Sequence, residues 1–167
     1  TIDQDMIYYD TQALTRNAIT QMLLQQEDLG LRVHAVSSLE EADVFTTDSY
    51  GVGMLLCNIK SGNVLDPNIS ELITGLRSLF PKRPCAVLSE LEDPAAISAA
   101  LHMGLQGYLS TCSPPAVIVE AIRLIRAGGI YAPPVPLLQA PPKWQRQDAT
   151  TTASGFSHRQ QQILECL

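Results

Sequence analysis

A tryptophan beside cationic side chains is the first feature of this sequence that could bind a ligand. Trp144, the only tryptophan of the chain, follows Lys143 and lies two residues before Arg146. An aromatic face close to positive charge can stack on a nucleotide base and pair with its phosphates. A nucleotide contact through Trp144 and Arg146 is therefore one interpretation, and a solvated linker is the other.

Four cysteines and three histidines are the other candidates for chemistry. Cys57 and Cys112 end short apolar runs, where sites of α/β proteins often form, so a redox role and inert thiols are both open. The cysteines form no C-x-x-C pair, and His34, His102 and His158 are isolated in the sequence, so no metal site is indicated. Because the G-x-G-x-x-G, Walker and nucleophile-elbow motifs do not occur either, we expect neither an enzyme nor a bound cofactor.

Length and charge narrow the class of protein. The 167 residues, of which 46% are hydrophobic and 17% charged, suffice for one domain with a full core and a short appendage. A formal charge of −6 does not provide the electrostatic footprint of a complete nucleic-acid-binding protein. The longest apolar stretches, such as residues 52–57, are far shorter than the ~18 residues of a membrane span. With scattered cysteines and no secretory signal, this composition predicts a cytoplasmic protein.

Five apolar runs alternate with amphipathic stretches as far as Pro133, a pattern typical of βα units and a mainly parallel sheet. The apolar runs predict strands at residues 6–9, 31–36, 52–58, 85–89 and 107–110. The stretches between them predict helices at residues 12–26, 38–48, 68–79 and 93–104, with a fifth after the last strand. Ser38 followed by Glu41 is a capping box at the start of the second helix.

The first helix should pack on the sheet through one face. Residues four apart lie above one another on a helix, so a face is expected to contain the following side chains: Leu14, Ala18, Ile19, Met22 and Leu23.

The fifth helix has the clearest limits, with Ser113 as its expected N-cap, Pro114 in its first turn and Gly128 and Gly129 after its end. Its apolar residues sweep an arc of roughly 160°, wider than the ~100° stripe that packing on a sheet needs. Two interpretations follow, a face that meets a second subunit and a helix buried between its neighbours. The candidate dimer face consists of Val117, Ile118, Val119, Ile122 and Ile125.

Proline, glutamine, threonine and serine dominate residues 133–155, so this segment is predicted to be a flexible linker. A last helix is predicted at residues 156–167, with Ser157 as N-cap and Phe156 packing against its first turn. A helix this short is marginal by itself, so we expect it to open a larger helical unit.

The order and spacing of these segments resemble a known family. "GYLSTCSPPAVIVEAIRLIRAGGIYAPP" resembles the last strand and last helix of response-regulator receiver domains, and "FSHRQQQILECL" resembles the opening of a LuxR-type helix-turn-helix. The resemblance implies a flavodoxin-like α/β fold over residues 1–132, with a five-stranded parallel sheet in the order 2-1-3-4-5 and five helices. A linker at 133–155 would then lead to the first helix of a DNA-binding domain at 156–167, with the recognition helix beyond Leu167.

The resemblance also implies a phosphorylation pocket. Receiver domains use an acidic pair after strand one, an aspartate after strand three, a hydroxyl after strand four and a lysine after strand five, together with magnesium. These positions fall on Asp10, Thr11, Asn58, Ser89 and Thr111. Only the first and the fourth keep the expected chemistry.

Such a pocket is expected to be silent. The neutral amide of Asn58 is too weak a nucleophile to form an acyl phosphate. Thr111 cannot make a lysine's ion pair to a phosphoryl oxygen, and the single carboxylate of Asp10 offers little charge to Mg²⁺.

Nearby residues leave two questions open. Four acidic residues would restore negative charge if they entered the pocket, although solvated loops or helix caps are the favoured positions for Asp66, Glu90, Glu92 and Asp93. Tyr108 matches the aromatic residue that switches position in the resembling family, and either a half-buried strand tyrosine or a working switch fits.

The resemblance therefore implies a bacterial transcription regulator of the two-component type that acts without phosphorylation. Its partners would be a second copy of the chain and DNA, the latter contacted by the C-terminal domain, and no membrane. The alternative is a domain that senses an unknown small ligand, such as a cyclic dinucleotide at Trp144 and Arg146, whose spacing departs from that of known regulators of this kind.

Overall fold

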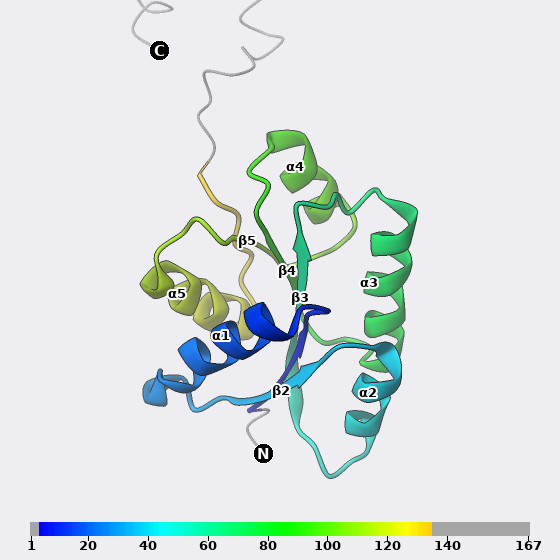
Figure 1. Cartoon of the computed structure of the whole chain (residues 1–167), viewed down its shortest axis with the longest axis vertical. Helices are drawn as coiled ribbons and strands as arrows, with labels where there is room; N and C mark the ends of the chain where they lie inside the picture. Colours follow the sequence, from blue (N-terminus) through cyan, green and yellow to red (C-terminus); the bar gives the residue numbers. More distant parts are fainter. Residues whose placement is uncertain (1–3, 135–167) are drawn as a thin grey trace, which may run out of the picture. The chain divides into compact units, whose positions relative to one another are not determined.

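Short runs of apolar residues form five parallel strands in the order β2-β1-β3-β4-β5. The computed structural model describes residues 4–134, and Figure 1 shows their arrangement. The strands are β1 (Asp5–Tyr9), β2 (Arg32–Val36), β3 (Val52–Lys60), β4 (Cys85–Ser89) and β5 (Gly107–Ser110). Every residue of β1, β4 and β5 is buried, as expected for a parallel sheet that is covered on both faces. The predicted fold and strand order are confirmed.

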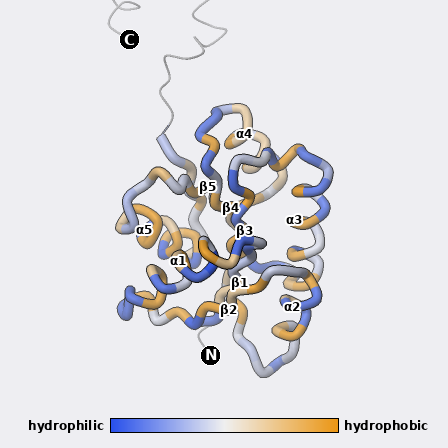
Figure 2. Tube along the Cα trace, viewed as in Figure 1, coloured by the Kyte–Doolittle hydropathy of each residue, from blue (hydrophilic) through white to orange (hydrophobic). Residues whose placement is uncertain are grey.

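Helices cover both faces of this sheet. In Figure 1, α1 (Ala13–Leu24) and α5 (Pro115–Arg126) lie on one side, and α2 (Leu39–Asp43) and α3 (Pro67–Leu79) lie on the other. The remaining helix, α4 (Pro94–His102), packs against β5. Figure 2 shows that the hydrophobic positions of α3 lie on its side toward the sheet. Single 3₁₀ turns at Glu27–Leu29 and Val44–Thr46 complete the elements.

Polar side chains begin three of the helices. The hydroxyl of Ser38 accepts a hydrogen bond from the backbone N–H of Glu41, which confirms the predicted cap of α2. Asp66 and Asp93 cap α3 and α4 in the same way, each through a backbone N–H two residues further on. The α-helical part of α2 is shorter than predicted, because a 3₁₀ turn replaces it after Asp43.

The start of α5 differs from the prediction. Its N-cap is Pro114 and not Ser113, and no side chain caps this helix. The ring of Pro114 fixes its own φ at −57°, and Pro115 keeps Pro114 out of the α region, with a ψ of 148°. Ser113 instead donates its backbone N–H to the carbonyl of Ser110 over 3.1 Å.

Burial corrects the candidate dimer face on α5. Four of its five residues, Ile118, Val119, Ile122 and Ile125, are no more than 5% exposed and belong to the core. Their side chains are consequently not available to a second subunit. Val117 is the exception, with 38% of its surface exposed. The wide apolar arc of α5 therefore reflects burial against the sheet and neighbouring elements.

The sheet-facing side of α1 is also different from the prediction. Ile19, Met22 and Leu23 pack against the core, whereas Leu14 is 85% exposed and Ala18 is exposed as well. At 100° per residue, Ile19, Met22 and Leu23 define one direction, and Leu14 and Ala18 point roughly 90° or more away from it.

Asp5 connects neighbouring strands at the amino-terminal end of β1. Its buried carboxylate accepts hydrogen bonds from Arg32 (2.8 Å) and from the backbone N–H of Gly51 (2.9 Å), and it lies 2.7 Å from Nε2 of His34. The His34 ring stacks on Phe45 with a centroid distance of 4.3 Å. Burial alone would raise the pKa of Asp5, but the hydrogen bonds from His34, Arg32 and Gly51 outweigh it and lower that pKa.

Replacing this carboxylate tests the role of Asp5. We expect Asp5→Asn to lower the free energy of unfolding at neutral pH by ~1–2 kcal/mol, a modest value because Arg32 is largely exposed. Since the folded-state pKa of Asp5 is lowered, its stabilisation is present above the ordinary carboxyl pKa and is lost as the pH falls through the lowered one. Urea unfolding at neutral and acidic pH should therefore show a difference that shrinks in acid, and a constant difference would contradict this role.

Candidate functional site

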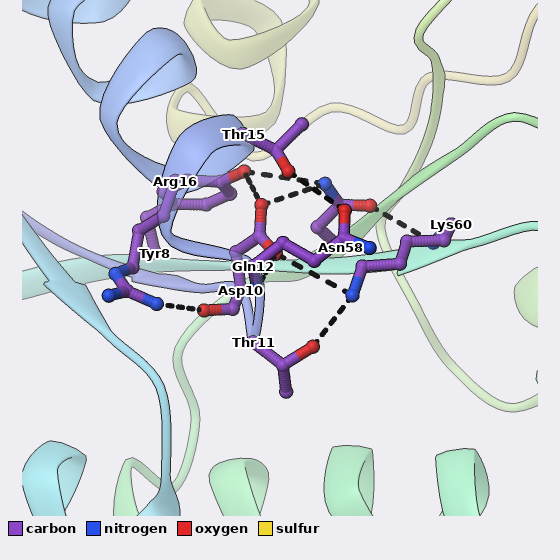
Figure 3. Close-up of polar contacts among 8 residues, drawn as sticks. All are labelled: Tyr8, Asp10, Thr11, Gln12, Thr15, Arg16, Asn58 and Lys60. Carbon is purple, nitrogen blue, oxygen red and sulfur yellow. Dashed lines mark hydrogen bonds and ion pairs between the residues drawn. The ribbon is translucent and has the colours of Figure 1, made fainter.

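A bulge at the end of β3 positions the candidate site. Asn58 pairs with Leu88 and Lys60 pairs with Ser89, so Ile59 is an extra residue on β3. After the bulge, Lys60 has a φ of +56°, in the left-handed region that side-chain-bearing residues rarely adopt. Bulges change the direction of side chains and often lie beside functional sites. Here the bulge brings the Asn58 and Lys60 side chains to the segment that follows β1 (Figure 3).

Asp10 is the centre of this site. It is 0% exposed, and each carboxylate oxygen has two partners from the chain itself (Figure 3). Oδ2 accepts hydrogen bonds from the hydroxyl of Tyr8 (2.9 Å) and from Nδ2 of Asn58 (3.1 Å). Oδ1 accepts the backbone N–H of Gln12 (2.8 Å) and lies 4.0 Å from the ammonium of Lys60. The carboxylate is therefore surrounded by donors and positive charge.

The amide of Asn58 has a defined orientation. Its Oδ1 accepts the backbone N–H of Lys60 over 3.0 Å, so its Nδ2 faces the carboxylate of Asp10 and lies 3.4 Å from the hydroxyl of Tyr8. Because a backbone N–H can only donate and a carboxylate can only accept, no other orientation satisfies both neighbours. A second carboxylate at position 58 would place negative oxygen against negative oxygen.

Tyr8 contributes a permanent donor to the site. Burial raises the pKa of the Tyr8 hydroxyl far above its ordinary range, and the nearby Asp10 carboxylate raises it further, while a hydrogen bond from Asn58 opposes the shift. The hydroxyl therefore stays protonated at physiological pH and donates to Asp10.

Lys60 supplies the positive charge of the site. Its ammonium donates to the hydroxyl of Thr11 over 2.7 Å and lies near the Asp10 carboxylate. At such a separation and an effective dielectric constant of ~20, the attraction is roughly 4 kcal/mol before the cost of desolvation. Arg16 also approaches this segment, but it donates to the backbone carbonyl of Asp10 (2.8 Å).

The two remaining predicted pocket residues lie at the same edge of the sheet, with their hydroxyls engaged by the backbone. Ser89 donates to the carbonyl of Lys60 (2.9 Å) and accepts the N–H of Leu91 (3.0 Å). Thr111 is exposed, and its hydroxyl lies 3.5 Å from the carbonyl of Ser89. The structure thus joins Asp10, Thr11 and Asn58 through side chains and connects Ser89 and Thr111 through backbone groups.

Tyr108 is fully buried rather than half-buried. Its hydroxyl donates to the carbonyl of Leu91 in the loop after β4, and burial raises its pKa. The acidic residues that the sequence left open do not enter the pocket: Asp66 and Asp93 cap helices, and Glu90 and Glu92 are exposed.

Sequence reasoning missed Tyr8 and Lys60. Tyr8 could have been predicted, because it lies on β1 two residues before Asp10, which directly follows the strand, and alternate residues of an extended chain share a face. Lys60 follows Asn58 by two residues, but its direction depends on the bulge and the left-handed backbone.

The other sequence candidates lie elsewhere. Cys57 is buried, and burial strongly raises its pKa, which favours the inert thiol. Cys112 is exposed, and both thiols are free. Trp144 and Arg146 lie outside the described residues, as do the predicted linker from residue 135 onward and the helix at 156–167.

The residues of this pocket do not fit a magnesium site. Mg²⁺ favours an octahedral set of oxygens that includes carboxylates or phosphates. The pocket offers one carboxylate, which already has partners on both oxygens, and an ammonium beside it. Within residues 4–134, moreover, no group of three or more His, Cys, Asp or Glu side chains could hold a metal ion.

The helices of the same region are all too short or too polar to cross a membrane.

Comparison with known proteins shows which proteins this chain resembles. No family model matches the chain. The transcriptional regulatory protein UhpA of Escherichia coli is 29% identical over 126 residues, which cover 75% of this chain and 60% of UhpA. Among solved structures, a LuxR family DNA-binding response regulator from Silicibacter pomeroyi matches with a TM-score of 0.63, 22% identity and coverage of 78% and 97% of the two chains. The isolated REC domain of RcsB from Salmonella enterica matches with a TM-score of 0.61, 19% identity and coverage of 78% and 94%.

The five parallel strands in the order 2-1-3-4-5 match the fold of CheY-like receiver domains. The sequence of the chain makes it a homologue of UhpA, and the match spans 60% of that regulator's length.

Restoring a carboxylate at position 58 tests the pocket geometry. We expect Asn58→Asp to lower the free energy of unfolding at neutral pH by about 3 kcal/mol, because two like charges would lie close together in a buried site. The pKa of the introduced carboxyl group should rise, so the loss should diminish as the pH falls through that raised value. Asn17→Asp, an exposed change on α1, is the matched control. Equal stability of both variants in urea unfolding would contradict the geometry.

Proposed function

We propose that this chain is the regulatory receiver domain of a transcription regulator and that it acts without aspartyl phosphorylation. The observation that carries the proposal is the saturated carboxylate of Asp10, whose partners all come from the chain. Phosphorylation would need an anionic oxygen at position 58, where the structure has the Nδ2 of an amide directed at Asp10. It would also need a metal to neutralise the incoming charge, and the pocket offers no suitable set of oxygens.

A hydrogen-bonded path links this pocket to β5 without a phosphoryl group. It runs from Asp10 through the Asn58 amide to the backbone of Lys60, and from there to the hydroxyl of Ser89. Ser89 accepts the N–H of Leu91, whose carbonyl accepts the hydroxyl of Tyr108. Because the path is closed by the chain's own groups, the domain has one connected arrangement that requires no modification. This supports a regulator whose pocket needs no phosphoryl group to be satisfied and that is controlled at its surfaces.

Acetyl phosphate with Mg²⁺ tests the silent pocket. We expect intact-mass measurement to show no phosphoryl increment, because position 58 has no nucleophilic oxygen. A phosphorylatable receiver domain in a parallel sample must gain the increment for the result to count. A phosphoryl increment on this chain, mapped to any residue of the pocket, would refute phosphorylation independence.

Dimerisation is the second part of the proposal, through the exposed side of α5. An apolar hollow of about 410 Å³ lies there, lined by residues that include Val117, Leu124 and Tyr131. Leu124 is 45% exposed, and exposed large apolar side chains are typical of contact surfaces. Glu120 and Arg123 form an ion pair beside this surface, and Arg123 also binds Asp28. A two-fold axis would bring the apolar side chains of two copies together, which favours a second copy as the occupant.

Introducing a charge on this surface tests the dimer. Leu124→Glu should raise the dissociation constant of the dimer about tenfold or more, because an apolar contact is replaced by a desolvated carboxylate. Leu65→Glu, at an exposed leucine before α3, is the matched control and should leave the dimer intact. Sedimentation velocity over a concentration series measures both. A monomer at all concentrations, or equal dissociation of the two variants, would count against this interface.

DNA recognition belongs to the C-terminal part in this proposal. The opening "FSHRQQQILECL" at residues 156–167 and the description of the Silicibacter pomeroyi neighbour as a DNA-binding response regulator support it. The name of UhpA supports transcriptional regulation. In this proposal the chain belongs to a cytoplasmic regulator that has no catalytic activity of its own.

A further inference from the structure

Lys60 is held in place more firmly than a lysine at the end of a strand needs to be. Its backbone N–H donates to the side chain of Asn58, and its carbonyl accepts both the hydroxyl of Ser89 and the backbone N–H of Glu90 (2.8 Å). At the far end of the side chain, the ammonium donates to Thr11 (Figure 3). A lysine side chain is flexible and strongly hydrated, so anchoring at both ends is unusual for a residue that only faces solvent.

The direction of the Lys60 side chain depends on an uncommon backbone. The bulge at Ile59 and the positive φ of Lys60 turn its chain toward the segment after β1. Residues held in such a conformation persist where their surroundings favour it and occur frequently at functional sites. In this structure, the result is an ammonium 4.0 Å from a carboxylate that has no exposure to solvent.

Among the described residues, Lys60 is the only cation paired with the Asp10 carboxylate. Tyr8, Asn58 and the backbone of Gln12 supply hydrogen bonds to Asp10 but no net charge. Arg16 donates to the backbone carbonyl of Asp10. The Lys60 side chain is 28% exposed, so its charge is only partly screened by water.

We propose that the Lys60 ammonium is a tethered cation that neutralises Asp10 in the place where a phosphorylatable receiver would use a divalent metal ion. The pocket then needs no metal and excludes one by charge, since a divalent cation would approach an ammonium at short range. The inference rests on the proposed function, because a tethered cation is compatible with a pocket that never binds a phosphoryl group. It goes further by assigning a role to a residue of this chain.

A double-mutant cycle tests the charge compensation. Lys60→Met keeps an unbranched side chain only one atom shorter and removes its charge, and Asp10→Asn removes the charge that it would neutralise. In urea unfolding, we expect Lys60→Met to lower the equilibrium constant for folding on the order of tenfold in the wild-type background and to have little effect in the Asp10→Asn background. An equal loss in both backgrounds would overturn the proposal, since Lys60 would then act only through packing.

Cations in solution provide a second measurement. The unfolding midpoint of the wild type should be the same with MgCl₂ as with NaCl of equal ionic strength. Stabilisation of the wild type by Mg²⁺ would overturn the tethered cation. If Lys60→Met fails to fold, Thr11→Val removes only the tether and Lys60→Arg keeps the charge. The first should then be less stable than wild type at low ionic strength and the second close to it, and the reverse order would contradict the proposal.

The two proposals fail separately. A chain that acetyl phosphate labels refutes phosphorylation independence, whatever the cycle shows. A chain that stays unlabelled, yet is stabilised by Mg²⁺ or shows no coupling between Lys60 and Asp10, refutes the tethered cation and leaves phosphorylation independence in place.

Discussion

A buried carboxylate has to be neutralised by whatever surrounds it, and in this domain that requirement applies to Asp10. Desolvating such a group costs several kcal/mol unless hydrogen bonds and an opposite charge compensate. The compensating groups come from distant parts of the sequence, since Tyr8 lies on β1 while Asn58 and Lys60 lie at the end of β3. The bulge in β3 is what brings the last two within reach. The backbone geometry at the end of β3 therefore determines whether the Asp10 carboxylate is neutralised.

The same constraint extends across the sheet. Asn58 cannot turn its amide without exposing its oxygen to the carboxylate, and the carbonyl of Lys60 is bound by Ser89. Ser89 in turn positions the loop that accepts the hydroxyl of Tyr108. Networks of this kind are rigid when every member is satisfied, and removing one member leaves its neighbours buried without partners. The hydrogen bonds of this pocket thus connect β1 with β5.

The fold was predictable from the sequence because its signals are local and repeated. Buried parallel strands appear as continuous apolar runs, and Ser38, Asp66 and Asp93 precede helices at capping positions. The side of each helix that faces the core was harder to predict from the sequence. The periodicity of α5 showed a wide apolar face but not that Ile118, Ile122 and Ile125 all turn inward, and on α1 it selected Leu14, which is exposed. Which side of a helix meets the core depends on its neighbours in space, and these are not encoded in the helix itself.

The candidate site was predictable only where strand ends define it. Asp10, Asn58 and Ser89 follow apolar runs, and the carboxyl ends of parallel strands meet at one edge of the sheet. Lys60 escaped because its role depends on an extra residue in the ladder and a left-handed φ, neither of which has a composition signal. The role of Lys60 also follows from the neutral side chain of Asn58. The neutral amide at position 58 donates a hydrogen bond to Asp10 but adds no charge, so the buried carboxylate still requires a cation. The amide of Asn58 and the ammonium of Lys60 therefore stabilise the same carboxylate, and a change at either position alters how much stabilisation Asp10 needs from the other.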